Sequence, residues 1–373
     1  MVNHVQKIPT YCNIARRFIC SSGEVVHVLV KAVELMILLM SEAIPGLEKK
    51  KILISGLDNA GKTSLLDLVQ GKLVKEIEMQ PTRGISRREA EIMGQALTIA
   101  DLGGQEQYRK QYEDNPIKVF PATDAFIFVV DLQDRQRHFV SLGYFETTLG
   151  LFDGLGVHPR VFVLFHKFDH TYRASYNDPR KNVREEVNSL KDRFTASARK
   201  YNFDIYEFYR TSIYDEWSVY AAFYDVWSSL ITRLDSVQEY LDQLVSTVPG
   251  VSLVLLLDTN GNLIGKNLAG STMESAVELV ELANKAITAL VELRNTKTGE
   301  MLGDTNLVTF EIGELEAFVR SFQSDEKTFF LILAKSAGSD DETRDILNNL
   351  TYSLSVFLPT LEDKTDAPDA PVE

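Results

Sequence analysis

Between residues 48 and 234, short apolar runs alternate with longer segments whose apolar residues recur at helical spacing. A short apolar run bounded by polar residues predicts a buried strand, and a period near 3.6 predicts an amphipathic helix. Strands that alternate with helices are typical of an α/β domain. Asp178-Pro179 predicts the start of the charged helix that ends near Lys200. The predicted strands are residues 51–55, 88–91, 96–100, 125–131, 161–165 and 205–209.

The pattern changes after about residue 235. A helix is followed there by a hairpin with the turn Asn260-Gly261, a second helix, three strands and a last helix. This order predicts an α+β domain over residues 235–361 with an antiparallel sheet. The tail, residues 362–373, is rich in Asp, Pro and Ala, a composition that predicts disorder. The predicted elements are residues 236–247, 251–258, 263–267, 273–294, 307–312, 315–321, 329–335 and 341–357.

The N-terminal segment, residues 1–47, contains an apolar stretch whose polar positions include His27, Lys31 and Glu34. Steps of four and three place these polar groups on one stripe of a helix. The apolar run is too short and too charged for a membrane span, and no signal-peptide cleavage site is evident. Two interpretations stay open: an interfacial helix that contacts a membrane peripherally, or a helix packed on this protein or its partner.

Composition narrows the functional classes. The chain has 373 residues, which is enough for two or three domains. Its formal net charge of -14 argues against nucleic acid as a partner, because nucleic-acid binders need a basic face. The two cysteines, Cys12 and Cys20, are too few for a disulfide framework or a zinc site. We therefore expect a cytoplasmic protein.

Residues 56–63 read GLDNAGKT and lie between a predicted strand and a predicted helix. This is the context of a P-loop, in which glycines let the backbone wrap a polyphosphate and N–H groups point at the anion. Lys62 is expected to reach the outer phosphates, and the Thr63 hydroxyl is expected to ligate Mg²⁺. The predicted nucleotide contacts of the loop are Asp58, Asn59, Ala60, Gly61, Lys62, Thr63 and Ser64.

A second motif, residues 101–105, follows a predicted strand and reads DLGGQ. An acid at the end of a strand can hold Mg²⁺ through water, which is the expected role of Asp101. Gly104 allows the backbone to approach a γ-phosphate, and Gln105 stands where a water-orienting glutamine belongs. This motif adds hydrolysis to the predicted nucleotide site.

Two further motifs predict the base. His166-Lys167-Phe168-Asp169 follows a buried strand. The aliphatic stem of Lys167 can pack on the plane of a base, while Asp169 can accept hydrogen bonds from two ring N–H groups of guanine. Adenine lacks that donor pair. Ser212 and Ile213 follow the last strand and can close over the base. The four motifs lie at strand ends, where open α/β sheets bind ligands.

With these motifs, the chain resembles a Ras-superfamily small GTPase. The P-loop, residues 80–85 (QPTRGI) and the DLGGQ motif are similar to Arf proteins. In contrast, HKFD and residues 209–216 (YRTSIYDE) are similar to Rag GTPases. Rag proteins also carry a roadblock-type domain after the G domain. The resemblance covers about residues 48–360 and implies a P-loop GTPase domain followed by a roadblock/longin-like domain.

The resemblance also implies roles for single residues. Thr82 matches the switch-I threonine that meets Mg²⁺ and the γ-phosphate in the GTP state, so the implied metal ligands are Thr63, Thr82 and Asp101. Gln105 is the implied catalytic residue. His166 departs from the asparagine of most relatives. The implied cofactors are GTP or GDP with Mg²⁺, and the implied activity is slow GTP hydrolysis stimulated by an activating protein.

Two functional interpretations follow. In the first, the chain is a switch that hydrolyses GTP and recruits partners by nucleotide state, with its activator, exchange factor and effectors unidentified. In the second, it keeps its nucleotide permanently and serves as a structural subunit of a roadblock-mediated homo- or heterodimer. Thr82, Asp101 and Gln105 favour the first, since a retired switch can lose them. Lys167-x-Asp169 disfavours a P-loop ATPase or kinase.

Overall fold

A computed structural model describes eight stretches of the chain. They are residues 49–69, 82–246, 251–258, 261–267, 307–312, 315–324, 327–336 and 340–362. Several predictions lie outside the described residues: the segment 1–47, the start of the QPTRGI motif, the helix 273–294, Asn260 of the hairpin turn, and nearly all of the tail.

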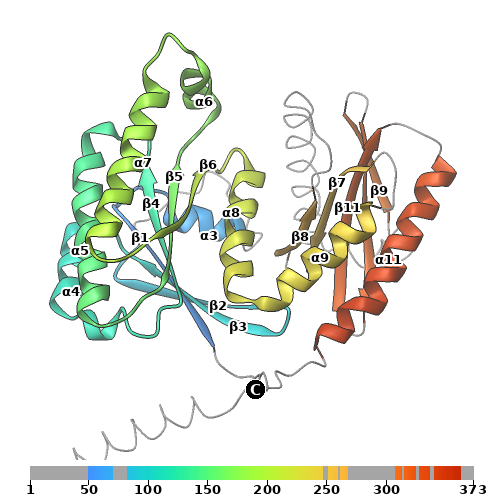
Figure 1. Cartoon of the computed structure of the whole chain (residues 1–373), viewed down its shortest axis with the longest axis horizontal. Helices are drawn as coiled ribbons and strands as arrows, with labels where there is room; N and C mark the ends of the chain where they lie inside the picture. Colours follow the sequence, from blue (N-terminus) through green and yellow to red (C-terminus); the bar gives the residue numbers. More distant parts are fainter. Residues whose placement is uncertain are drawn as a thin grey trace, which may run out of the picture. The chain divides into compact units, whose positions relative to one another are not determined.

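The first sheet has six strands in the order β2-β3-β1-β4-β5-β6 (Figure 1). The pairs β1–β3, β1–β4, β4–β5 and β5–β6 are parallel, and β2 pairs with β3 in an antiparallel hairpin. The predicted α/β fold is confirmed, with strands that extend slightly beyond the predicted runs. The strands are β1 (Lys50–Gly56), β2 (Ile85–Ile92), β3 (Gln95–Leu102), β4 (Ala125–Asp131), β5 (Arg160–His166) and β6 (Ile205–Thr211).

Helices cover both faces of this sheet (Figure 1). Alternate residues of β1 divide between two cores: Ile52 and Ile54 pack with α3 and α8, whereas Leu53 packs with α5 and α7. This period of two follows from the pleat of a strand that is buried on both faces. The helices are α3 (Lys62–Val69), α4 (Glu106–Asp114), α5 (His138–Gly154), α6 (His170–Asn177), α7 (Val183–Lys200) and α8 (Glu216–Leu230), with 3₁₀ turns η1 (Pro116–Lys118) and η2 (Arg135–Arg137).

The predicted start of the charged helix at Asp178-Pro179 is wrong. Asp178 ends α6, and α7 begins at Val183. The Asp178 carboxylate accepts from the backbone N–H of Arg180 at 3.0 Å and from its side chain. The Asp178 carboxylate thus forms hydrogen bonds within its own turn and does not cap the helix that follows. Asp side chains commonly form such local hydrogen bonds with the backbone in place of a helix cap.

The second sheet has five antiparallel strands in the order β8-β7-β11-β10-β9. Helix α9 packs on β8, and α11 packs on β10. Helix α11 continues through Pro359, past the predicted end of the last helix at residue 357. The elements are α9 (Thr232–Ser246), β7 (Val251–Leu257), β8 (Leu263–Asn267), β9 (Leu307–Ile312), β10 (Leu315–Ser324), β11 (Lys327–Ser336) and α11 (Asp340–Glu362).

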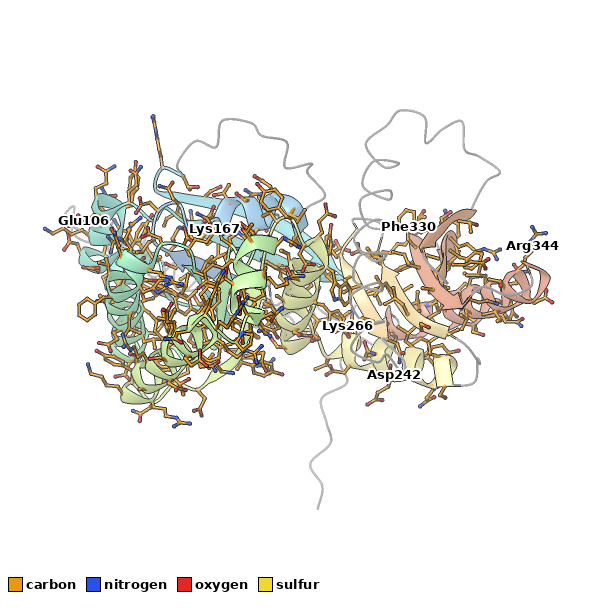
Figure 2. The ribbon with its side chains drawn as sticks, turned by 90° about the horizontal axis from the view of Figure 1, so that it is seen from above. Glu106, Lys167, Asp242, Lys266, Phe330 and Arg344 are labelled. Carbon is orange, nitrogen blue, oxygen red and sulfur yellow. The ribbon has the colours of Figure 1, made fainter. Side chains whose placement is uncertain are left out.

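Helices α8 and α9 share one hydrophobic core with the second sheet. Polar contacts also join these elements. Lys266 of β8, which is labelled in Figure 2, pairs with Asp225 of α8 at 2.8 Å. Gln238 of α9 donates to the Lys266 carbonyl at 2.6 Å. The predicted boundary near residue 234 falls inside α9, and the division into domains stays a prediction. Within the described residues, the helices are too short or too polar to traverse a bilayer.

Candidate functional site

A cavity of about 350 Å³ opens at the carboxyl ends of the parallel strands. The predicted site residues line it except Ala60, Asp101 and Ser212, which are buried and belong to the same segments. Tyr214 is an addition that the sequence analysis missed. The lining residues are Asp58, Asn59, Gly61, Lys62, Thr63, Ser64, Thr82, Gly104, Gln105, His166, Lys167, Asp169, Ile213 and Tyr214.

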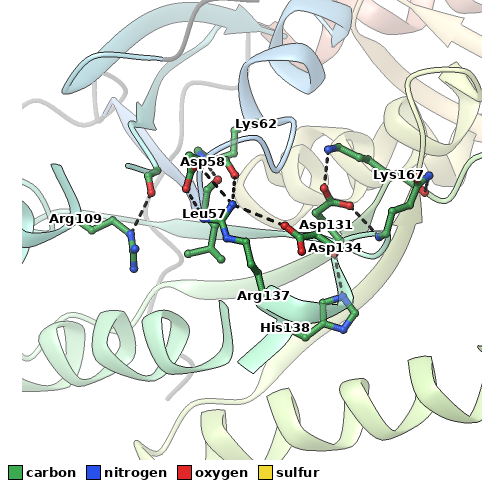
Figure 3. Close-up of polar contacts among 11 residues, drawn as sticks. Leu57, Asp58, Lys62, Arg109, Asp131, Asp134, Arg137, His138 and Lys167 are labelled. Carbon is green, nitrogen blue, oxygen red and sulfur yellow. Dashed lines mark hydrogen bonds and ion pairs between the residues drawn. The ribbon is translucent and has the colours of Figure 1, made fainter. Parts of the chain in front are cut away.

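The ammonium group of Lys62 lies against the P-loop itself. It donates to the carbonyl oxygens of Gly56 at 3.0 Å and Leu57 at 2.8 Å, and the residue is almost fully buried (Figure 3). Burial lowers the pKa of Lys62 to about 8, with the charges of Asp101 and Asp58 acting in the opposite direction. A buried cation held by neutral carbonyls can be stabilised further by an anion, so the loop is suited to phosphate.

The position of Gly61 requires a glycine because it packs against His166 of the HKFD motif, called the base-side motif below. Its φ is +92°, and a Cβ atom there would lie 2.4 Å from Cδ2 and 2.7 Å from Nε2 of His166. The backbone conformation also favours glycine. The ring of His166 is buried, and its Nδ1 lies 3.0 Å from the Thr211 hydroxyl. The histidine that replaces asparagine therefore joins the P-loop to the end of β6 by packing and by one hydrogen bond.

Three oxygen-bearing side chains meet below the P-loop. The Thr63 hydroxyl donates to Asp101 Oδ2 at 2.7 Å, and the hydroxyls of Thr63 and Thr82 are 2.8 Å apart. Asp101 is fully buried, and its Oδ1 has no hydrogen-bond partner among the described residues. Burial raises the pKa of the Asp101 carboxyl although Thr63 and Lys62 lower it. This hard oxygen donor set with a buried, unsatisfied carboxylate oxygen fits Mg²⁺.

The DLGGQ motif closes the phosphate end of the cavity. A Cβ atom on Gly104 would lie 2.3 Å from the backbone of Leu57 and of Asp58, so only glycine fits there. Arg109 of α4 donates to the Gly104 carbonyl at 3.1 Å (Figure 3). Gln105 lies at the start of α4 and lines the same cavity. The predicted water-orienting residue is thus beside the P-loop.

The base-side motif presents a fully oriented carboxylate. One oxygen of Asp169 accepts from the Ser212 hydroxyl, and the other accepts from the Gln133 amide at 2.9 Å. Lys167 pairs with Asp131, the last residue of β4, at 2.6 Å (Figure 3). These contacts orient Asp169 and Lys167, which both line the cavity, in agreement with the predicted guanine site.

His166 gives a pH-dependent stability that can be measured. Burial lowers its pKa to about 4, with the Lys167 charge acting in the same direction, against about 6.5 for an unfolded histidine. Between pH 6.5 and 4 the unfolded state binds a proton that the folded state does not. The free energy of unfolding therefore falls by about 3 kcal/mol, through this group, as the pH falls through that window.

We expect His166→Asn to remove this part of the pH dependence. The measurement is the free energy of unfolding by denaturant at several values between pH 7 and pH 4, for parent and variant. His170→Asn, at an exposed position four residues later, is the control and should retain the parent's slope. If the slopes of the parent and His166→Asn are the same, the buried, neutral histidine is contradicted.

Three residues of the site were not predicted. Arg137 of η2 forms an ion pair with Asp58, Gln133 contacts Asp169, and the exposed Tyr214 lines the cavity. Tyr214 stands inside the YRTSIYDE motif and could have been inferred from it. Arg137 and Gln133 are in the connection after β4, which carries no local signal that predicts their partners.

Comparison with known proteins places these observations in context. A family model described as the Gtr1/RagA G protein conserved region matches residues 51–280, more than half of the chain. ADP-ribosylation factor-like protein 2 of Drosophila melanogaster is 38% identical over 87 residues, which is 23% of this chain and 44% of that protein. ADP-ribosylation factor-like protein alp41 of Schizosaccharomyces pombe is 39% identical over 87 residues, which again is 23% of this chain and 44% of that protein. The chain thus spans less than half the length of these curated relatives.

Among solved structures, the Arl6 BBS3 small GTPase from Trypanosoma brucei with the bound nucleotide analogue GppNp is similar to this chain. The TM-score is 0.36, and 22% of the aligned residues are identical. The similarity covers 47% of this chain and 93% of that one.

Proposed function

This chain belongs to the Gtr1/RagA G-protein family, and we propose that it is a GTP-binding switch that hydrolyses GTP to GDP and phosphate and recruits partners by nucleotide state. One observation carries the proposal. Side chains suited to phosphate, to a divalent cation and to guanine line or flank a single cavity at the carboxyl ends of parallel strands. In open α/β sheets this is where ligands bind.

Each part of the nucleotide has its own residues in this proposal. Lys62 and the P-loop amides bind the outer phosphates. Thr63, Thr82 and Asp101 would hold Mg²⁺. When bound, the ion neutralises phosphate charge. Gln105 orients the water that attacks the γ-phosphate.

The alternative, a permanently nucleotide-bound structural subunit, is less well supported. Thr82 contacts Thr63 at 2.8 Å, and Gln105 lines the same cavity. A chain without hydrolysis has no need to keep both side chains in these places. The alternative predicts that the bound nucleotide neither turns over nor exchanges.

Single-turnover phosphate release tests the proposed hydrolysis. Protein loaded with radiolabelled GTP and Mg²⁺ should release phosphate slowly, on the order of 10⁻⁴ s⁻¹ without an activator. Protein loaded with radiolabelled ATP should release none. Retention of all the label over a day, alone and with cell extract, would support the structural subunit instead.

We also propose that the second sheet and its helices form a roadblock-type dimerisation surface, with a homodimer or a heterodimer as the product. Tyr352 and Val356, one turn apart on α11, are 72% and 56% exposed. Exposed apolar residues on one helical face are suited to an interface.

The segment 1–47 is a candidate for peripheral membrane contact in an otherwise cytoplasmic protein.

Sedimentation of the whole chain measures this association. The shared core of α8, α9 and the second sheet makes a fragment starting at residue 236 unsuitable. A stable interface buries about 1,200–2,000 Å² and should survive dilution to micromolar concentration. Tyr352→Ser with Val356→Ser should shift the mass toward the monomer. A parent chain that is monomeric and pairs with no second roadblock protein contradicts the proposed surface.

A further inference from the structure

An ion pair joins the P-loop to the connection after β4. The guanidinium of Arg137 pairs with the carboxylate of Asp58, and its Nη1 also lies 3.4 Å from the backbone carbonyl oxygen of Asp58 (Figure 3). The two residues are 79 positions apart in the sequence. An arginine that contacts both the side chain and the backbone of one P-loop residue restricts the conformation of the loop.

Arg137 itself is fixed by its position. It is the last residue of η2 and precedes the first residue of α5, His138. The His138 ring contacts the carbonyl oxygen of Asp131 at 3.0 Å, which ties the start of the helix to the end of β4. Asp134 lies 3.8 Å from the Arg137 guanidinium as a second acid. Arg137 thus lies where η2 meets α5, at a point that the His138 contact joins to the end of β4.

Asp58 lines the cavity together with the other P-loop residues. Its backbone amide is in close contact with Gly104, the residue expected to meet a γ-phosphate. Burial raises the pKa of the Asp58 carboxyl, while the hydrogen bond and the charge of Arg137 lower it. The lowering effects together are larger, so the pKa is below its ordinary value. The carboxylate is therefore ionised. Without a counter-ion it would repel a terminal phosphate at this place.

We propose that Arg137 is a positioning residue for the third phosphate: it neutralises Asp58 and holds that carboxylate toward the start of α5, so that the P-loop discriminates in favour of GTP over GDP. The inference rests on the proposed nucleotide-binding function. It concerns affinity rather than the chemical step, because Arg137 acts through Asp58. GDP lacks the third phosphate, so its binding should depend less on this pair.

Binding of a non-hydrolysable GTP analogue and of GDP tests the inference. Both are titrated with Mg²⁺ against the parent, Arg137→Ala, Asp58→Asn and the double variant. We expect Arg137→Ala to weaken analogue binding about 10–100-fold and GDP binding by much less. The double variant should recover the parent's preference, because no carboxylate is left to repel the phosphate. A structural role alone would not give this rescue.

Arg135→Ala is the matched control. Arg135 lies in the same 3₁₀ turn and pairs with Glu186 of α7 at 2.9 Å, away from the P-loop. It should leave both affinities unchanged. Arg137→Lys keeps the charge and should retain most of the preference, which makes the test independent of any loss of stability in Arg137→Ala.

Four results would overturn the inference. Equal losses of analogue and GDP binding in Arg137→Ala, without rescue by Asp58→Asn, would leave Arg137 a purely structural role. Normal analogue binding with slower phosphate release would make it a group that acts on the reaction instead. A parent that binds neither nucleotide would overturn the proposed function as well, whereas a binding-competent parent with unaltered preference in Arg137→Ala overturns the inference alone.

Discussion

Asp169→Asn should change the nucleotide preference from guanine to xanthine. In the parent, Asp169 accepts from Ser212 and Gln133, so both of its oxygens point to donors at the edge of the cavity. Guanine offers two N–H donors to such a carboxylate, while xanthine has a carbonyl oxygen in place of the exocyclic amine. A site built around a hydrogen bond rejects a base that cannot make it by about 10⁴–10⁵.

Competition binding of GTP, XTP and ATP gives the answer. The parent should prefer GTP over both competitors, and Asp169→Asn should lose about 10⁴ in GTP affinity while it gains XTP binding. Asp178→Asn is the matched control, because Asp178 contacts Arg180 in an exposed turn and does not line the cavity. If ATP competes as well as GTP with the parent, the guanine assignment is wrong.

Gln105→Leu should keep GTP binding and lose stimulated hydrolysis. Gln105 lines the cavity at the start of α4, and its side-chain oxygen accepts from Gln107 at 3.0 Å. Two arginines near the P-loop, Arg109 and Arg137, are engaged with Gly104 and Asp58. We therefore expect an activating protein to supply the arginine that meets the γ-phosphate charge, which is worth about 10³–10⁵ in rate.

Single-turnover phosphate release measures this effect, with cell extract as the source of activator. The parent should be accelerated by several orders of magnitude, while Gln105→Leu should stay at the slow rate of the protein alone. Gln111→Leu, an exposed change on the same helix, is the control and should behave as the parent. Equal stimulated rates for Gln105→Leu and the parent would remove Gln105 from the mechanism.

The sequence predicted the strands of the first sheet and most of the cavity because both signals are local. Each motif directly follows an apolar strand, so the position of Lys62 or Asp169 depends mainly on where one strand ends. The Rag resemblance is confirmed by the family match. The roadblock identity of the second sheet stays a prediction, since the described strands and helices fit an α+β domain without distinguishing its family.

What could not be predicted depends on distant partners. The ion pair of Arg137 with Asp58 joins residues 79 positions apart, and the contact of Gln133 with Asp169 joins residues 36 apart. Asp178-Pro179 has the composition of a helix start, but the Asp178 carboxylate is taken by the N–H of Arg180. The role of His166 became visible only with its packing on Gly61, which tertiary structure alone provides.

The nucleotide carried by the purified protein tests the central claim most directly. Protein purified in Mg²⁺ is denatured, and the released small molecules are separated by chromatography beside GDP, GTP, ADP and ATP standards. We predict guanine nucleotide at close to one equivalent per chain, and much less from Lys62→Ala. Adenine nucleotide in its place, or an empty parent that binds GTP no better than ATP, would contradict the account.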